Sequence, residues 1–231
     1  MALNWAARLL PLSTLEEIKG IVCSLLGELL PVPIREVVNR DWFNPNIELP
    51  YQLRLADFEM AMQDVYDFFF DVNSLFNQKG LPRLEEVLRP ANMSGTISDM
   101  ITVSLAQHSR SLCQNGYFNG HPDLIVHGEY EHDSVRAGEL GVEIKTTRKR
   151  GGAVDTHGAR EQWMCVFVYE VDQATQPAKD RSATRFTEVY LAHVTTDDFR
   201  KNSRGELGTR TATLHREGVQ KLRGSWVYLA Q

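Results

Sequence analysis

The 231-residue sequence lacks several features that would define its class at once. No apolar run is long enough to span a bilayer, and residues 1–10 do not have the pattern of a secretory signal. The three cysteines, Cys23, Cys113 and Cys165, are far apart and form no CxxC pair. These absences argue against a zinc site or a disulfide framework, and they favour a cytoplasmic protein without membrane contact.

Motifs of several enzyme classes are also missing. The sequence has no GxSxG, HExxH or GxxxxGK[ST] motif, so triad hydrolases, zincins and P-loop NTPases lose their usual support. A group of histidines lies close to acidic residues between positions 121 and 132, but its spacing matches no known metal-ligand pattern. We therefore expect a polar loop there; the group consists of His121, His127, His132, Glu129 and Glu131.

Positive charge is scarce overall but gathers in one half of the chain. The formal net charge is −5, and residues 1–99 hold 8 Lys/Arg against 14 Asp/Glu. The remainder therefore carries about +1, with basic clusters at residues 145–150 and 200–223. Each cluster alone is compatible with an ordinary solvated surface. Because both fall in the half that carries the chemistry described below, they favour DNA as a partner.

The first half of the chain is predicted to be helical. Ser13 and Glu16 have the spacing of a capping box for a helix that runs to Leu30 and ends at Pro31 and Pro33. A longer helix follows, whose apolar stripe consists of Leu55, Phe58, Met62, Val65, Phe69, Val72 and Phe76. Its other faces hold Asp57, Glu59, Asp64, Asp67 and Asp71. Phe68 and Phe70 widen the apolar surface, which indicates burial in the core alone or in a dimer interface as well.

Shorter elements complete the pattern. A helix at Leu84–Leu88 is expected to stop at Pro90, and another after Ser94 to present a shared face, made by Ile97, Ile101, Leu105, His108 and Leu112. Strands are expected at 124–126, 140–147, 163–171, 186–194 and 226–229, a flexible polar connection at 172–185, and a last helix at 215–222. This order predicts an α+β or mixed α/β fold around one sheet. Residues 1–92 would form a helical region for packing, dimerisation or DNA recognition, and 93–231 the core.

The chemistry concentrates in two short segments, Pro122–Val126 and Gly141–Lys145. Because side chains alternate along a strand, Glu143 and Lys145 project from one face while Val142 and Ile144 enter the core. If the two segments pair, Asp123 joins them. Two carboxylates suit Mg²⁺, and the carbonyl of Ile144 could add a further ligand. A lysine beside them would lower the pKa of an attacking water or offset charge in the transition state.

These residues resemble the signature of the PD-(D/E)XK nuclease superfamily, which includes most type II restriction endonucleases. The matching residues are Pro122-Asp123 and Glu143-Ile144-Lys145, about 25 residues of the chain with the segment between them. The resemblance implies a mixed sheet flanked by helices and one or two Mg²⁺ ions held by Asp123 and Glu143. It also implies that Lys145 activates or orients the water, leaving 5′-phosphate and 3′-hydroxyl ends.

The resemblance also suggests supporting residues. An acidic or polar residue often comes from the preceding helix, where Asp99 is the candidate, and another from the next strand, where the candidates are Glu161 and Gln162. The segment from Thr146 to Gly152 leaves the strand of Lys145, and Thr147 within it is a candidate for DNA binding. Its cations, Arg148, Lys149 and Arg150, could bind phosphates or read a guanine edge; the alternative is a polar hairpin loop.

The sequence therefore predicts a Mg²⁺-dependent type II restriction-like endonuclease acting on double-stranded DNA. A homodimer is expected because two active sites would cut the two strands of a symmetric target. Three alternatives stay open: a modification-dependent, repair or recombination nuclease of the same superfamily, a DNA-binding protein that does not cut, and a protein unrelated to nucleic acid whose ExK pattern is coincidental.

Overall fold

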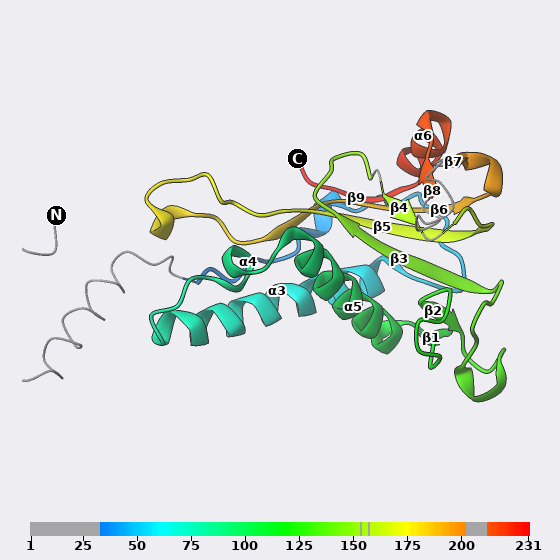
Figure 1. Ribbon diagram of the computed structural model, residues 1–231, viewed down its shortest axis with the longest axis horizontal. Coiled ribbons are helices and arrows are strands. Elements are labelled where there is room, and N and C mark those ends of the chain that lie inside the picture. Colours follow the sequence, from blue (N-terminus) through cyan, green and yellow to red (C-terminus); the bar gives the residue numbers. More distant parts are fainter. Residues whose placement is uncertain (1–32, 153, 157, 202–211) are drawn as a thin grey trace, which may run out of the picture.

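The computed structural model describes residues 33–152, 154–156, 158–201 and 212–231 (Figure 1). Its centre is a six-stranded mixed sheet in the order β1-β2-β3-β5-β6-β9. The strands are β1 (Leu112–Gln114), β2 (Leu124–Val126), β3 (Gly141–Thr147), β5 (Gln162–Glu170), β6 (Arg185–Val194) and β9 (Trp226–Leu229). β3 and β5 are parallel, and the other neighbours are antiparallel. The mixed α/β class and all five predicted strands are confirmed, whereas β1 was not expected.

Helices cover one face of this sheet, and a smaller layer covers the other (Figure 1). The first set consists of α3 (Leu55–Gln78), α4 (Leu84–Val87) and α5 (Pro90–His108). The second layer holds α6 (Arg216–Gly224) and a small sheet of β4 (Asp155–Thr156), β8 (Ala212–Leu214) and β7 (Phe199–Lys201). Short 3₁₀ turns are η1 (Arg40–Trp42), η2 (Glu131–Asp133), η3 (Ala178–Asp180) and η4 (Thr196–Asp198). Among the described helices, none combines the length and apolarity needed to cross a membrane.

Alternation along the central strand β5 explains why the molecule has two cores. Cys165, Phe167 and Tyr169 point into the core shared with α3 and α5. Met164 and Val166 point into the second core, with α6 and the small sheet. A strand buried on both faces reads as a continuous apolar run, which is the pattern of residues 163–169.

The apolar stripe of α3 is confirmed, but one of its acidic residues is placed differently from the prediction. Phe58, Met62 and Phe69 are buried in the same core as the central strands. Asp57, expected on a polar face, is fully buried because it closes the first turn of the helix and forms an ion pair with Arg54. The ion pair with the arginine offsets the free-energy cost of removing this carboxylate from water.

Two boundary predictions need correction. Pro90 begins α5, which was expected to start after Ser94, because proline at a first helical position loses no intrahelical hydrogen bond. Leu112 belongs to β1 and not to the face of that helix. Within the predicted connection 172–185, Asp172 accepts hydrogen bonds from the backbone of Thr175 and Ser182, and the flexibility of this segment stays a prediction. The predicted helix from Ser13 to Leu30 lies outside the described residues.

Candidate active site

The pairing of β2 with β3 brings Asp123 to the site. Leu124 lies opposite Val142, so continuing this antiparallel register by one residue places Asp123 opposite Glu143. The backbone N–H of Ile144 donates to Oδ2 of Asp123 at 2.8 Å. Gly141 permits this approach, because a Cβ there would lie 2.0 Å from the carbonyl oxygen of Leu124. The strand pairing predicted from the sequence is therefore confirmed.

Glu143 and Lys145 project from the face of β3 that Val142 and Ile144 leave free, as alternation predicts. Nζ of Lys145 donates to Oε1 of Glu143 at 2.5 Å. The Glu143 side chain is 7% exposed and that of Lys145 is 24% exposed. The pair is thus a largely buried ion pair at one end of an apolar sheet.

Two further side chains surround Glu143, and one of them was not identified from the sequence. Nδ1 of His121 lies 2.7 Å from Oε2 of Glu143, and its Nε2 shares a hydrogen bond of 2.7 Å with Oε1 of Gln162. Gln162 begins β5 and is buried, in agreement with the suggestion that it supports the site. His121 was assigned to a polar loop, although it stands only two residues before Asp123 and this adjacency could have indicated it.

The pKa values of the two carboxylates are shifted in opposite directions. Burial raises the pKa of Glu143, but the contacts with His121 and Lys145 outweigh burial and lower it below its usual value. Burial and the charge of Glu143 raise the pKa of Asp123 to about 6. Although His121 is close, Oε2 of Glu143 accepts no hydrogen bond from any described residue. The contact of this buried oxygen with Nδ1 of His121 is therefore a close ionic approach of 2.7 Å without the geometry of a hydrogen bond.

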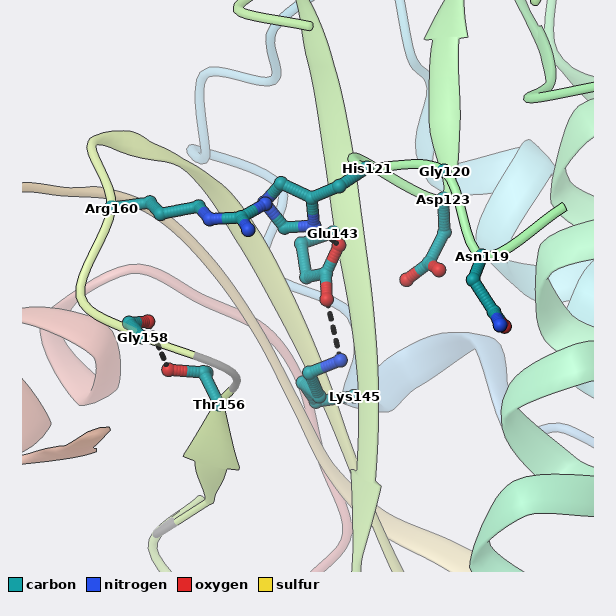
Figure 2. Close-up of a pocket in the computed structure, with 9 residues that line it drawn as sticks. All are labelled: Asn119, Gly120, His121, Asp123, Glu143, Lys145, Thr156, Gly158 and Arg160. Atoms are coloured by element: carbon teal, nitrogen blue, oxygen red, sulfur yellow. Dashed lines mark hydrogen bonds and ion pairs between the residues drawn. The ribbon is translucent and has the colours of Figure 1, made fainter. Parts of the chain in front are cut away.

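A cavity of about 460 Å³ opens over these groups (Figure 2). Its walls combine the loop before β2, the middle of β3 and the segment after β4; the lining residues are Asn119, Gly120, His121, Asp123, Glu143, Lys145, Thr156, Gly158 and Arg160. Arg160 adds a positive charge that the sequence did not single out, because it comes from a loop without a distinctive pattern. Carboxylates, an amine and a guanidinium thus share one open cavity.

The remaining supporting residues are not brought to Glu143. Asp99 is exposed on α5 and lines a neighbouring cavity of about 640 Å³, whose wall also includes Asp123. The Glu161 side chain is 69% exposed, and its nearest ionic partner is His193 at 3.9 Å. The carbonyl oxygen of Ile144 accepts a hydrogen bond from Ser98 at 3.4 Å.

The basic loop lies at the opposite end of β3 from Glu143. Five residues separate Glu143 from Arg148, or roughly 17 Å at the rise of a strand. Arg148 donates to the carbonyl of Val171, and Arg150 lies 3.6 Å from Glu170. Thr147 is buried, and its hydroxyl accepts the N–H of Lys149. Arg148 and Arg150 are thus engaged beyond the end of β3, and a role of this loop in DNA binding stays a prediction. Of the second basic cluster, Lys221 pairs with Asp198, and 202–211 lie outside the described residues.

The site fits a hard divalent cation on its own chemistry. Asp123 and Glu143 provide carboxylate oxygens, the donors that Mg²⁺ prefers, and both residues line the open cavity, where water ligands have room. Lys145 and Arg160 leave positive charge nearby for an anionic substrate. Among the described residues that line the cavity, none offers a sulfur ligand, and His121 offers the one imidazole nitrogen.

Comparison with known proteins identifies no protein similar to this chain. The chain matches no protein-family model, no curated protein and no solved structure.

Proposed function

We propose that the protein is a Mg²⁺-dependent endonuclease that hydrolyses phosphodiester bonds of double-stranded DNA, of the type II restriction kind. The single observation that carries the proposal is the convergence of Asp123, Glu143 and Lys145 in one open cavity. Two carboxylates and a lysine around a solvent-filled space are the groups that metal-assisted phosphodiester hydrolysis requires.

Each residue has a role that follows from its place. Asp123 and Glu143 would hold Mg²⁺, which supplies positive charge to neutralise the phosphate when it is bound. Lys145 has its ammonium on the same face as both carboxylates and would donate to the attacking water or to a phosphate oxygen. His121 and Gln162 are positioning residues, because they act on Glu143 and on each other.

DNA would reach the cavity from the side of the loop before β2. Arg160 lines the cavity wall and would contact a phosphate. Phe118, 87% exposed, and Tyr117, 44% exposed, stand on the loop that also carries His121, where an aromatic ring could insert between base steps of the duplex. One cavity cuts one strand, so a homodimer that cuts both strands is part of the proposal.

The test is cleavage of plasmid DNA with Mg²⁺, on methylated and unmethylated substrates. We expect discrete fragments, and Glu143→Gln or Lys145→Ala should lower the cleavage rate by at least about a thousand-fold while binding in Ca²⁺ persists. Glu161→Gln is the matched control: it removes a neighbouring carboxylate that points away from the cavity, and it should cut normally. Circular dichroism would verify that each variant is folded.

The outcomes also separate the alternatives. DNA binding without cleavage on every substrate would indicate a DNA-binding protein that does not cut. Cleavage of methylated DNA alone would indicate a modification-dependent nuclease. The absence of both DNA binding and DNA cleavage would overturn the proposal. Sequencing of the cut ends would give the recognition site, the stagger and the end chemistry together.

A further inference from the structure

A second group of metal-ligand side chains lies outside the proposed nuclease cavity. It consists of Cys113 on β1, His127 directly after β2 and Asp133 in η2, and one ligand atom from each lies within 4.8 Å of the others. The spacing of the cysteines in the sequence argues against a zinc site. It could not reveal this group, because the three ligands come from separate segments that only the fold brings together. We define this group as the Cys113 cluster.

The backbone aims Asp133 at the other two residues. Oδ1 of Asp133 accepts the N–H of Gly128 at 2.7 Å, while Oδ2 lies 2.8 Å from Nδ1 of His127. The carbonyl of Asp133 accepts the N–H of Gly116 at 2.8 Å. His132 and Asp133 have φ angles of 55° and 48°, in the left-handed region where Asp and His occur more often than most non-glycine residues.

The other two ligands are anchored as well, and the cluster is open to solvent. Cys113 pairs with Ile125 across the β1–β2 ladder, and the backbone N–H of His127 donates to the carbonyl of Ser111 at 2.8 Å. The His127 side chain is 71% exposed and that of Asp133 is 29% exposed. An ion therefore has an entry path, and a water molecule has room for a fourth coordination position.

We propose that Cys113, His127 and Asp133 bind one zinc ion, with water as the fourth ligand. Thiolate, imidazole and carboxylate are the donors that Zn²⁺ takes, whereas a thiolate does not suit Mg²⁺. Tetrahedral bonds of about 2.0–2.3 Å hold ligand atoms roughly 3.4–3.8 Å apart, so the contact between His127 and Asp133 must widen by about half an ångström. Side-chain rotation alone can supply this. As the sulfur–zinc bond forms, the thiol S–H bond breaks and its proton leaves to solvent.

Zinc here would fasten the excursion 127–133 to the outer end of the sheet. That excursion is already linked to the loop before Asp123, since Asp133 accepts from Gly116 and Asn115 bonds the carbonyls of Val135 and Pro122. The zinc ion would thus stiffen the loop that carries His121 and Phe118. The proposal is independent of nuclease activity and holds whether or not the protein cuts DNA.

Cobalt substitution of the full-length, chelator-treated protein tests the site without any activity assay. Co²⁺ bound to a thiolate gives a near-ultraviolet charge-transfer band, and we expect one equivalent to produce it and one equivalent of Zn²⁺ to abolish it. Cys113→Ser should remove the band. Cys23→Ser and Glu143→Gln should keep it, which separates the Cys113 cluster from the other thiols and from the proposed Mg²⁺ cavity.

Two histidines of the same turn provide a matched pair. His127→Asn should weaken Co²⁺ and Zn²⁺ binding by about 100-fold or more, because a ligand is lost, whereas His132→Asn should leave both unchanged. Asparagine is used because it tolerates the left-handed conformation of His132. Zinc should also raise the melting temperature of the wild type and not of Cys113→Ser. Absence of the band in the wild type, its survival in Cys113→Ser, or unchanged metal affinity in His127→Asn would overturn the proposal.

Discussion

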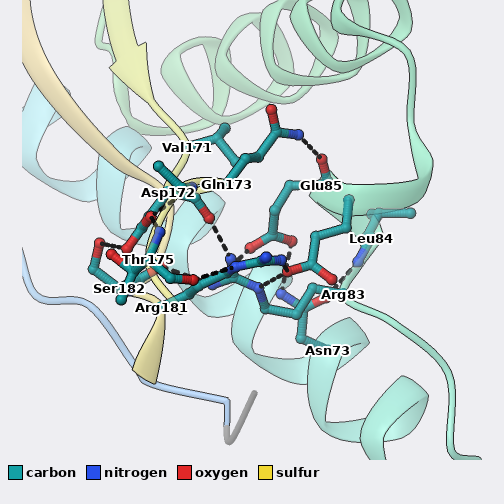
Figure 3. Close-up of polar contacts among 12 residues, drawn as sticks. Asn73, Arg83, Leu84, Glu85, Val171, Asp172, Gln173, Thr175, Arg181 and Ser182 are labelled. Atoms are coloured by element: carbon teal, nitrogen blue, oxygen red, sulfur yellow. Dashed lines mark hydrogen bonds and ion pairs between the residues drawn. The ribbon is translucent and has the colours of Figure 1, made fainter. Parts of the chain in front are cut away.

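The protein buries two clusters of charged side chains that differ in how completely their charged groups are hydrogen-bonded. The Glu143 cluster consists of His121, Asp123, Glu143, Lys145 and Gln162, and it faces the cavity of Figure 2. The Arg83 cluster consists of Asn73, Arg83, Glu85, Glu86 and Arg181, and it joins α3 and α4 to the segment after β5 (Figure 3). Both contain a glutamate that is almost inaccessible to solvent.

Every charged group of the Arg83 cluster has its partners. Arg83 donates to the carbonyls of Ser182 and Asp172 and pairs with Glu86, while Asn73 donates to Glu85 at 2.9 Å. In the Glu143 cluster, by contrast, Oε2 of Glu143 has the ionic contact with His121 but accepts no hydrogen bond from the described residues, and Asp123 has a raised pKa. A satisfied cluster serves the fold, whereas an unsatisfied one that opens to a cavity is the expected condition of a site that awaits a ligand.

The largest effect should come from removing Arg83. Arg83→Met leaves Glu85 buried without its cation, so we expect the free energy of unfolding to fall by about 3–5 kcal/mol. Urea denaturation followed by circular dichroism measures it. The control is Arg40→Met, which breaks the pair of Arg40 with Glu59; Arg40 is 79% exposed, and the loss should be under about 1 kcal/mol. Equal losses for the two variants would show that the Arg83 cluster is not structural.

The second effect concerns two arginines in different loops: Arg160 precedes β5 and Arg148 follows β3. Arg160 lines the cavity, so Arg160→Ala should slow DNA cleavage by about 10–100-fold and reduce the salt dependence of binding by about one unit of slope. Arg148 is held by the carbonyl of Val171, as Arg83 is held by carbonyls in its own cluster, so Arg148→Ala should change cleavage little. A larger loss for Arg148→Ala would confirm the role in DNA binding that the sequence predicts for the basic loop.

The sequence was informative where a single periodicity decides the structure. Alternation along a strand placed Glu143 and Lys145 on one face, and steps of three and four gave the buried stripe of α3. It could not place Asp57, because burial of that carboxylate depends on an ion pair with Arg54 as well as on the helical period. Local rules therefore predicted elements and faces, and they failed where one side chain changes the cost of burying another.

The parts of the site that were missed come from loops. His121 and Arg160 reach the cavity from segments whose course is set by tertiary contacts, such as the close approach at Gly141 and the hydrogen bonds of Asn115. The role predicted for the loop at Arg148 stays a prediction, although Arg148 itself donates to the carbonyl of Val171 beyond the end of β3.

The third effect is a change in pH dependence at Asp123. Its pKa is raised to about 6 in the folded protein, so the folded state binds more protons than the unfolded state, and stability falls as pH rises from about 4 towards 6. Asp123→Asn removes this penalty. Without divalent cations at pH 7, the variant should be more stable than the wild type by on the order of 1–2 kcal/mol, and the difference should vanish near pH 3. Thermal unfolding across pH with a chelator measures both; a variant less stable at pH 7 would contradict the raised pKa.

The smallest effect should come from Asp172, beside the Arg83 cluster, and its sign should be opposite. Backbone N–H groups of Thr175, Ser182 and Ala174 lower the pKa of Asp172, so its contribution to stability is full above its unfolded pKa. This contribution is lost as pH falls through the lower, folded pKa. Asp172→Asn should therefore reduce the melting temperature by a few degrees at pH 7 and by progressively less below about pH 4. DNA cleavage should not change, since Asp172 is remote from the cavity lining. Two aspartate-to-asparagine changes would thus shift stability in opposite directions at neutral pH, and shifts of the same sign would remove the distinction between the satisfied and the unsatisfied cluster.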